Sequence, residues 1–158
     1  MPIEKLKRFL DEESVKYLLI THSRAYTAQE AAAFAHIPGK ELAKTVIVKL
    51  DGRMAMAVLP ASFHVDLGHL AEVAEVEDVV LATEAEFAGL FPDCDTGAMP
   101  PFGNLYGMDV YVAESLAEDD EIAFSAGSHT ELVRMSYRDF ERLVKPKVLA
   151  FSEPTMPW

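Results

Sequence analysis

Apolar residues recur along the chain in short runs whose spacing predicts a mixture of helices and strands. Ile3, Leu6, Phe9 and Leu10 recur at helical spacing, which predicts an amphipathic helix over residues 3–13. Apolar runs on both sides of "DGR" predict a β-hairpin over residues 43–60. The same reasoning predicts strands over 15–20, 108–113, 121–126 and 130–135, helices over 27–37, 66–74, 83–90 and 136–144, and a short strand with a tail in the last eleven residues.

The order of these elements favours one fold class. Strands and helices alternate irregularly, with hairpins as well as crossovers, which predicts an α/β (α+β) fold with helices packed on a mixed sheet. The chain has 158 residues, of which 50% are hydrophobic, and this is enough to bury a sizeable core. Neither a repeat nor a linker interrupts it, so we expect a single domain over residues 1–158.

The chain shows no sign of a membrane or secretory destination. There is no run of 18 apolar residues, and the first fourteen residues mix charged with apolar side chains, so neither a membrane span nor a signal peptide is predicted. The single cysteine, Cys94, cannot form an internal disulfide. We therefore expect a cytoplasmic protein with no membrane partner.

Charge is distributed unevenly. The net charge is −12, yet all 14 Lys and Arg residues lie within 1–53 and 134–147, and 16 of the 26 acids lie between those two segments. If the two cationic segments fold side by side, the protein has one positive flank that would admit a polyanion. A solvated acidic surface without such a flank is the alternative.

Lys44 is the first candidate functional residue. In a strand it shares a face with Val46, Val48 and Leu50, which makes that face the expected core side. An ammonium group at the edge of an apolar face either reaches water or meets an anion. Both interpretations remain open from the strand pattern alone.

Two loops rich in glycine are further candidates. The stretch "TGAMPPFGNLYG" (96–107) holds no strong acid, base or nucleophile, so its backbone rather than its side chains is expected to contact a ligand. The stretch "SAGSHTE" (125–131) places backbone N–H groups beside a hydroxyl and an imidazole, a combination that can bind phosphate or carboxylate. A plain hairpin turn explains the second stretch equally well.

The remaining polar residues give weaker signals. His22, Tyr26 and Thr27 lie at a strand-to-helix junction, where loops often line pockets, although a helix cap alone explains Thr27. Cys94 stands between two aspartates, which disfavour its thiolate, so we expect it to be inert. The histidines show no metal-ligand spacing, and no metal is expected.

The succession "THSRAYTAQEAA", "ELAKTVIVKLDG", "AVLPA", "TGAMPPFG" and "AGSHTELVRMS" resembles the YbaK family, the editing domain associated with prolyl-tRNA synthetase and its free-standing relatives. The similarity runs over roughly residues 15 to 144. It implies a mixed, largely antiparallel, barrel-like sheet with surrounding helices. It also implies hydrolysis of the ester between a wrongly attached amino acid and the terminal adenosine of tRNA.

The resemblance also implies roles for individual residues. Lys44 matches the family's functional lysine, here the expected catalytic residue. Gly97 and Pro101 match a G-x-x-x-P loop whose main chain contacts the substrate amine. Substrate-binding roles are implied for the loop residues Ala98, Met99, Pro100, Phe102 and Gly103, the turn residues Gly127, Ser128 and His129, and His22, Tyr26 and Thr27. No cofactor is implied, and a ribose hydroxyl of the RNA is expected to help activate water.

The leading interpretation is therefore a trans-editing hydrolase that deacylates mischarged aminoacyl-tRNA carrying a small amino acid, on tRNA-Pro or a related tRNA. Met56, Met99, Phe102 and Tyr26 are expected to narrow the pocket. The acidic charge suggests either that a synthetase or an elongation factor delivers the tRNA, or that only the acceptor end is held, by cations of the first cationic segment such as Lys5, Lys40 and Lys44. The alternatives are a non-catalytic module that binds a tRNA end or an aminoacyl ligand, and a hydrolase of a different small aminoacyl ester.

Overall fold

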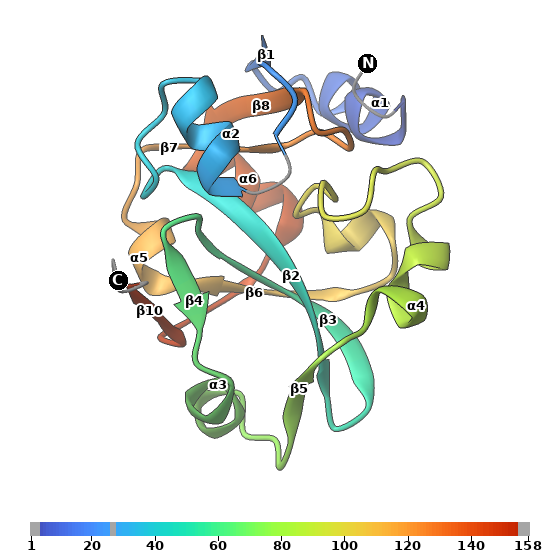
Figure 1. Cartoon of the computed structure of the whole chain (residues 1–158), viewed down its shortest axis with the longest axis vertical. Helices are drawn as coiled ribbons and strands as arrows, with labels where there is room; N and C mark the ends of the chain where they lie inside the picture. The colour runs from blue at the N-terminus through green and yellow to red at the C-terminus, as the bar shows by residue number, and fades with distance from the viewer. Residues whose placement is uncertain (1–3, 26–27, 155–158) are drawn as a thin grey trace.

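A hairpin of two long strands, β2 (Leu42–Leu50) and β3 (Arg53–Pro60), forms the centre of the computed structural model, which describes residues 4–25 and 28–154 (Figure 1). Asp51 and Gly52 join the strands, and both have positive φ, 48° and 86°. This is the backbone that a two-residue type I′ turn requires. The strands pair over eight residues each. The hairpin predicted from "DGR" is confirmed.

Six further strands complete one mixed eight-stranded sheet. They are β1 (Tyr17–Thr21), β5 (Val79–Leu81), β6 (Asp109–Ala113), β7 (Glu121–Ser125), β8 (Glu131–Ser136) and β9 (Lys147–Leu149). The order is β1-β8-β7-β2-β3-β6-β9, with β5 added to β2, and β4 (Phe63–Val65) pairs separately with β10 (Ser152–Pro154). The mixed α/β fold is confirmed, but the sheet ends at β1 and β9 instead of closing into a barrel.

Short helices surround the sheet. They are α1 (Glu4–Glu12), α2 (Ala28–Phe34), α3 (Leu67–Val73), α4 (Glu84–Phe87), α5 (Glu114–Ala117) and α6 (Tyr137–Val144), with 3-10 turns η1 (Ala88–Leu90) and η2 (Gly103–Leu105). Figure 1 shows α1 and α2 near β8, at one end of the molecule, and α3 beside β5 at the other. None of the helices in the described ranges is long and apolar enough to cross a membrane.

The predicted first residues of the helices agree with the structure better than the predicted last residues. Asp66 and Ser136 cap α3 and α6, each by accepting a hydrogen bond from a backbone N–H of the first turn at 3.0 Å. The predicted helix over 83–90 is α-helical only to Phe87 and continues as a 3-10 turn. Thr27, the expected cap of α2, lies outside the described residues.

Both faces of the central hairpin are buried, which corrects the expectation of a single core face. On one face Ile47 and Met56 belong to a cluster that includes Leu6 of α1 and Phe140 of α6. On the other face Val48 and Leu59 cluster with Leu70 of α3 and Phe151. Helices α1 and α6, from the two ends of the chain, cover one face and α3 covers the other, so the alternation along β2 could not identify one solvent side.

The edge of β2 opposite β3 is only partly paired. β7 pairs with β2 at Leu42 and Ala43, and β5 pairs with it from Val48 onward. The register with β3 directs the backbone groups of Thr45 away from β3, into the interval between β7 and β5. The sheet is therefore split at this interval, next to Lys44.

Asp119, just after α5, offers a test of the fold's electrostatics. Its Oδ2 is buried and accepts no hydrogen bond from any described residue; burial first, then the nearby Glu41 carboxylate, raise its pKa to about 6. At a pH between the pKa of Asp119 in the unfolded chain and its pKa in the folded protein, the folded state binds more protons than the unfolded state. The free energy of unfolding therefore falls as pH rises from about 4 to about 6.

We expect Asp119→Asn to raise the free energy of unfolding at pH 7 by about 1 kcal/mol, after allowance for solvent screening. Urea unfolding at pH 4, 5, 6 and 7 measures this, and the variant's stability should change less over that range. Asp120→Asn, at the exposed neighbouring position, is the control and should have little effect. Equal stability of Asp119→Asn and the wild type at pH 7 would contradict the prediction.

Candidate active site at the split in the central sheet

A small cavity lies at the split in the sheet. Its volume is about 20 Å³, room for roughly one water molecule or a methyl group. The described residues that line it come from four segments that are distant in sequence: His22, Ala25 and Ala31; Leu42, Ala43, Lys44 and Thr45; Gly97 and Met99; Ser125 and His129. Strand β2 thus supplies one wall, and the end of β7 supplies the others together with loop and helix residues.

Lys44, in the early part of β2, is one of the residues that line this cavity. Its side chain is half-buried, and burial lowers the pKa of the ammonium group from its ordinary value. Its Nζ donates one long hydrogen bond, 3.4 Å, to the carbonyl oxygen of Ala61. A half-buried cation held by a neutral carbonyl gains free energy when an anionic group enters the cavity.

The loop around Gly97 is a braced structure. Gly97 has φ of +87°, a conformation that glycine adopts without strain, and its N–H donates to Met99 Sδ at 3.3 Å. Both residues line the cavity. Residues 98–103 are all buried, so the two prolines stiffen a segment held inside the protein.

The turn at Gly127 faces this loop and is bonded to it. Gly127, with φ of +100°, donates its N–H to the Ala98 carbonyl at 3.0 Å and accepts the Asp95 N–H at 2.8 Å. His129 follows and lines the cavity. The structure therefore brings together the lysine, the glycine loop and the histidine turn, three of the groups singled out from the sequence.

Other predicted site residues lie away from the cavity lining. Ser128 directs its hydroxyl to Glu131 Oε1 at 3.2 Å, and Met56 is wholly buried in the core. Tyr26 and Thr27 lie outside the described residues, whereas His22 is among the lining residues.

Phe102 and Gly103 belong to the packing beneath the loop. The Phe102 ring is fully buried and lies 5.3 Å from the ring of Phe124 and 5.4 Å from that of Phe140. A Cβ on Gly103 would lie 2.5 Å from the Met108 carbonyl oxygen, so only glycine fits. These two residues hold the loop from below.

Sequence reasoning missed several lining residues. Ala25, Ala31, Leu42, Thr45 and Ser125 line the cavity, but none carries chemistry that would single it out. Thr45 and Ser125 could have been found from the sequence, because Thr45 follows Lys44 and Ser125 lies next to the Gly127 turn. Glu131, the first residue of β8 and two residues after His129, is buried at 5% exposure, and it is the one charged residue among those described that is buried.

The backbone of Gly97 provides a direct test of the loop. Gly97→Ala is expected to cost about 1–2 kcal/mol of stability because alanine disfavours this φ, and to lower the rate of the reaction at the cavity several-fold. The new Cβ would lie 3.9 Å from His129 Cε1 and narrow the space between loop and turn. Urea unfolding and an activity assay measure the two effects.

Gly52→Ala is the matched control for that substitution. Gly52 has nearly the same φ, +86°, and no atom within 4 Å of an added Cβ. It lies in the hairpin turn, far along β2 from Lys44, so we expect a similar stability loss without a change in activity. Equal activity losses in both variants would show that the Gly97 effect arises from general destabilisation.

Comparison with known proteins identifies the family. A family model described as an aminoacyl-tRNA editing domain matches residues 22–143, which is most of the chain. The chain belongs to this family. The matched range contains every cavity-lining residue named above. No curated protein matches the chain.

Solved structures share the editing-domain fold. A crystal structure of a hypothetical protein superposes with a TM-score of 0.84 at 23% identity, covering 95% of this chain and all of that chain. A protein described as "a putative trans-editing enzyme for prolyl tRNA synthetase" gives 0.79 at 20% identity, covering 94% and 95% of the two chains. A protein from Marinobacter aquaeolei VT8 described as a "Putative signal transduction protein" gives 0.75 at 17% identity, where the match covers 96% of this chain and 31% of that one.

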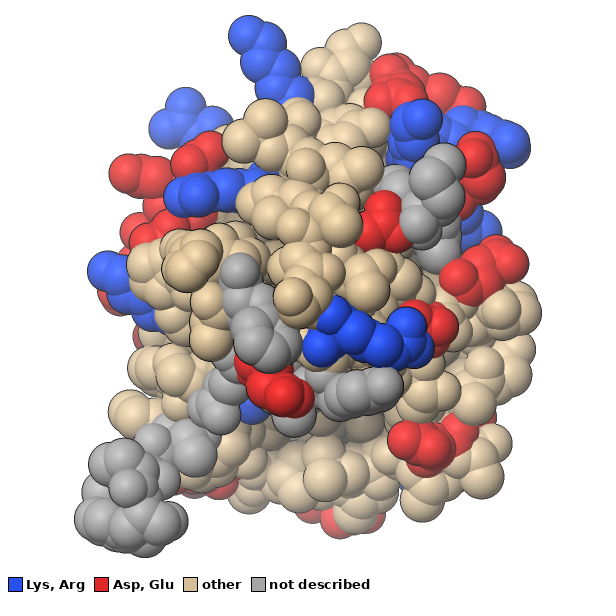
Figure 2. Space-filling model, turned by 45° about the horizontal axis from the view of Figure 1, so that its top comes forward, with Lys and Arg blue, Asp and Glu red and all other residues tan. Residues whose placement is uncertain are grey.

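Charge around the editing domain is mixed. Figure 2 shows Lys and Arg side chains spread over one face with Asp and Glu side chains beside them. Two cations that form ion pairs across the chain are Arg134, with Glu41 and Glu121, and Arg24, with Asp95. Pairing of this kind reduces the positive potential that a polyanion would meet, and this face mixes cations with acids instead of carrying the single positive flank that was one of the two alternatives.

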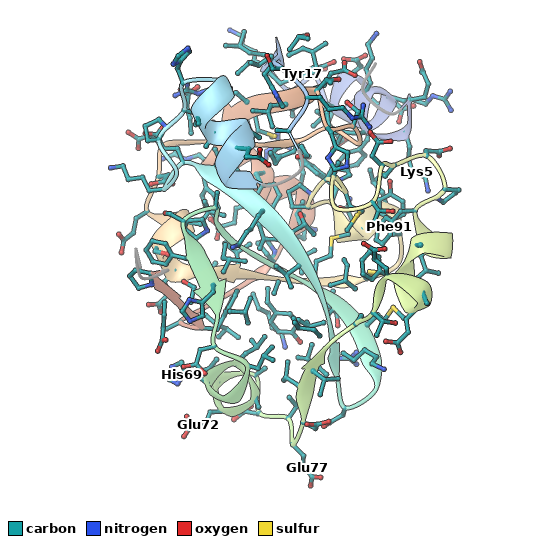
Figure 3. The ribbon with its side chains drawn as sticks, in the orientation of Figure 1. Lys5, Tyr17, His69, Glu72, Glu77 and Phe91 are labelled. Atoms are coloured by element: carbon teal, nitrogen blue, oxygen red, sulfur yellow. The ribbon has the colours of Figure 1, made fainter. Side chains whose placement is uncertain are left out.

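Cys94 lies in a packed cluster outside the cavity. Its Sγ is 3.7 Å from the Tyr106 hydroxyl, and burial raises the pKa of the thiol. Lys5 and Phe91, close together in Figure 3, both contact the Tyr106 ring, at 4.6 Å and 4.5 Å. A thiol with a raised pKa is a poor nucleophile at neutral pH. Within the described residues, no group of three or more His, Cys, Asp or Glu side chains is placed to hold a metal ion.

Proposed function

We propose that this editing domain acts in trans as an esterase that removes small, wrongly attached amino acids from tRNA. Water attacks the carbonyl carbon of the aminoacyl ester, and the bond to the ribose oxygen of the terminal adenosine breaks. The products are the free amino acid and a tRNA whose ribose hydroxyl is restored. Membership of the aminoacyl-tRNA editing domain family supports this reaction class.

The observation that carries the proposal is the shared cavity of Lys44 and Gly97. A half-buried ammonium in that cavity stabilises the oxyanion that develops as water adds to the ester, or pairs with the terminal phosphate. The glycine of the loop leaves room for the backbone to approach the ligand, where a carbonyl accepts the substrate amine. The imidazole of His129, which also lines the cavity, positions the ester, and a ribose hydroxyl of the substrate helps to activate the water.

The dimensions of the cavity favour a small amino acid. Ala25, Ala31 and Ala43 line it together with Met99. Its volume of about 20 Å³ is proposed to receive only the amino-acid side chain, a methyl or hydroxymethyl group, while the ester and the adenosine lie at its mouth. Exclusion by size discriminates against larger side chains better than a pocket discriminates against smaller ones. Alanine, serine and cysteine esters are the proposed substrates, and tRNA-Pro or a related tRNA is the proposed carrier.

Only the acceptor end of the tRNA is proposed to contact the domain. The net charge is −12, and cations such as Arg134 are already paired with acids. Affinity for RNA depends on unpaired Lys and Arg at phosphates. A synthetase or an elongation factor is therefore proposed to deliver the tRNA.

Release of labelled amino acid from a panel of mischarged tRNAs tests the proposal. We expect cleavage of small aminoacyl esters and none of leucyl or phenylalanyl esters, with a modest dependence of tRNA binding on salt. If no ester is cleaved, even with a cognate synthetase present, the domain is instead a binding module for a tRNA end or an aminoacyl ligand. If small aminoacyl esters without tRNA are cleaved as fast as the mischarged tRNAs, the substrate is instead a different aminoacyl ester.

A further inference from the structure

Three segments meet at the main chain of His129. The N–H of His129 donates to Asp95 Oδ2 at 3.2 Å, and its carbonyl oxygen accepts the N–H of Ala25 at 3.0 Å. The neighbouring Thr130 carbonyl accepts the His22 N–H at 2.9 Å. The turn that carries the imidazole is thus held from the glycine-loop side and from the segment that follows β1.

Asp95 is the residue that holds the glycine-loop side. Its backbone N–H donates to the Gly127 carbonyl at 2.8 Å, and its own carbonyl accepts the Ala98 N–H at 3.0 Å. Its carboxylate bonds the His129 N–H and lies 4.0 Å from a guanidinium nitrogen of Arg24. The main chain and the side chain of one residue therefore contact both loops that border the cavity.

The carboxylate cannot be explained as a surface charge alone. Asp93, two residues earlier, is exposed and shows what an ordinary acid in this segment does. The Asp95 side chain is partly buried, and its Oδ2 is bonded to a main-chain group on a different loop 34 residues away in sequence. A charged acceptor makes a stronger hydrogen bond to a backbone N–H than a neutral one.

We propose that Asp95 is a positioning residue of the active site, whose carboxylate fixes the His129 turn against the Gly97 loop. This role rests on the proposed function: Asp95 holds the His129 imidazole and the Gly97 backbone at the separation that the ester requires. It touches no reacting atom. Asp95 acts on the reaction only through the position of the His129 main chain. Its effect can still be large, because a displacement of about 1 Å in an active site can cost a hundredfold in rate.

Three variants of the full chain test the assignment: Asp95→Ala, which removes the acceptor; Asp95→Asn, whose amide oxygen can still accept the His129 N–H; and Asp93→Ala, which removes an equal charge nearby. Hydrogen exchange at the His129 amide, followed by NMR, reports the contact without reference to activity. Steady-state deacylation of an alanyl-tRNA gives kcat and KM, and urea unfolding gives the global stability.

For Asp95→Ala we expect tenfold or faster exchange at the His129 amide and a kcat at least tenfold lower, with KM changed by less than threefold. Asp95→Asn should recover most of both losses, and Asp93→Ala should match the wild type. Wild-type protection at His129 in Asp95→Ala overturns the proposal, as does an equal loss of kcat in Asp93→Ala. Faster exchange throughout the sheet in Asp95→Ala would overturn it too, by making the role one of global stability.

The exchange measurement also separates this proposal from the proposed function. If the wild-type chain cleaves no mischarged tRNA, the esterase assignment fails. The response of the His129 amide to the three variants still decides whether Asp95 holds the turn.

Discussion

Lys44→Ala is expected to lower the rate of deacylation by about 100-fold or more, because Lys44 is the one Lys or Arg among the described residues that line the cavity. The loss should fall mainly on kcat if Lys44 stabilises the oxyanion, and on KM if it binds the terminal phosphate. Single-turnover assays on a mischarged alanyl-tRNA measure both.

The fold is expected to survive this substitution. Burial lowers the pKa of Lys44, which means that the charged form is less favourable in the folded than in the unfolded state. Removing it therefore leaves the stability at pH 7 unchanged or slightly higher. Lys49→Ala is the matched control: Lys49 lies on the same strand, pairs with Glu86 and does not line the cavity. Full activity in Lys44→Ala would refute the role of this lysine.

The lowered pKa of Lys44 also sets the sense of a pH dependence. The ammonium form is the active one, so activity should decline as pH rises through the pKa, and at a lower pH than for an exposed lysine. The rate must be corrected for spontaneous hydrolysis of the ester. In Lys44→Arg this alkaline decline should move to higher pH, since the guanidinium keeps its proton.

Phe102→Ala is expected to lower the free energy of unfolding by about 3–5 kcal/mol. The ring is fully buried and contacts the rings of Phe9, Phe124 and Phe140 at 6.1, 5.3 and 5.4 Å. Its loss leaves a cavity that α1, β7 and α6 cannot fill together. Urea unfolding measures the change.

Phe87→Ala serves as the comparison. Phe87 is partly exposed on α4 and has one described ring partner, Phe91 at 6.4 Å, so its loss should be clearly smaller. The resemblance places Phe102 in the wall of the substrate pocket, whereas the structure places its ring in the core. Phe102→Ala with normal stability but lost activity would favour the first role over the second.

Local chemistry was sufficient to predict several parts of this editing domain. "DGR" predicts the β2–β3 hairpin because Asp and Gly accept the positive φ that a tight turn needs. The helices predicted over 66–74 and 136–144 begin at Asp66 and Ser136, whose short polar side chains satisfy a free N–H group of each first turn. Lys44, Gly97 and His129 were singled out by their residue types and their order, and the structure places all three on one cavity.

Other features depend on contacts between distant segments. The three-residue strands β5 and β9 carry too few residues to show a periodicity, and they form because β2 and β6 offer them an edge. Burial of both faces of the hairpin depends on α1, α6 and α3 packing from the two sides. The open ends of the sheet at β1 and β9, where a barrel-like closure was expected, depend on the strand order alone.

By itself, the sequence determined the turns, the helix starts and the residue types that the site uses, because those depend on the backbone preferences and side chains of a few neighbouring residues. Tertiary structure alone decided that β7 and β5 leave β2 unpaired beside Lys44, that Phe102 supports the loop from the core, and that Asp95 joins two loops. Each of these contacts spans tens of residues of chain, and its energy exists only once the sheet has brought the segments together.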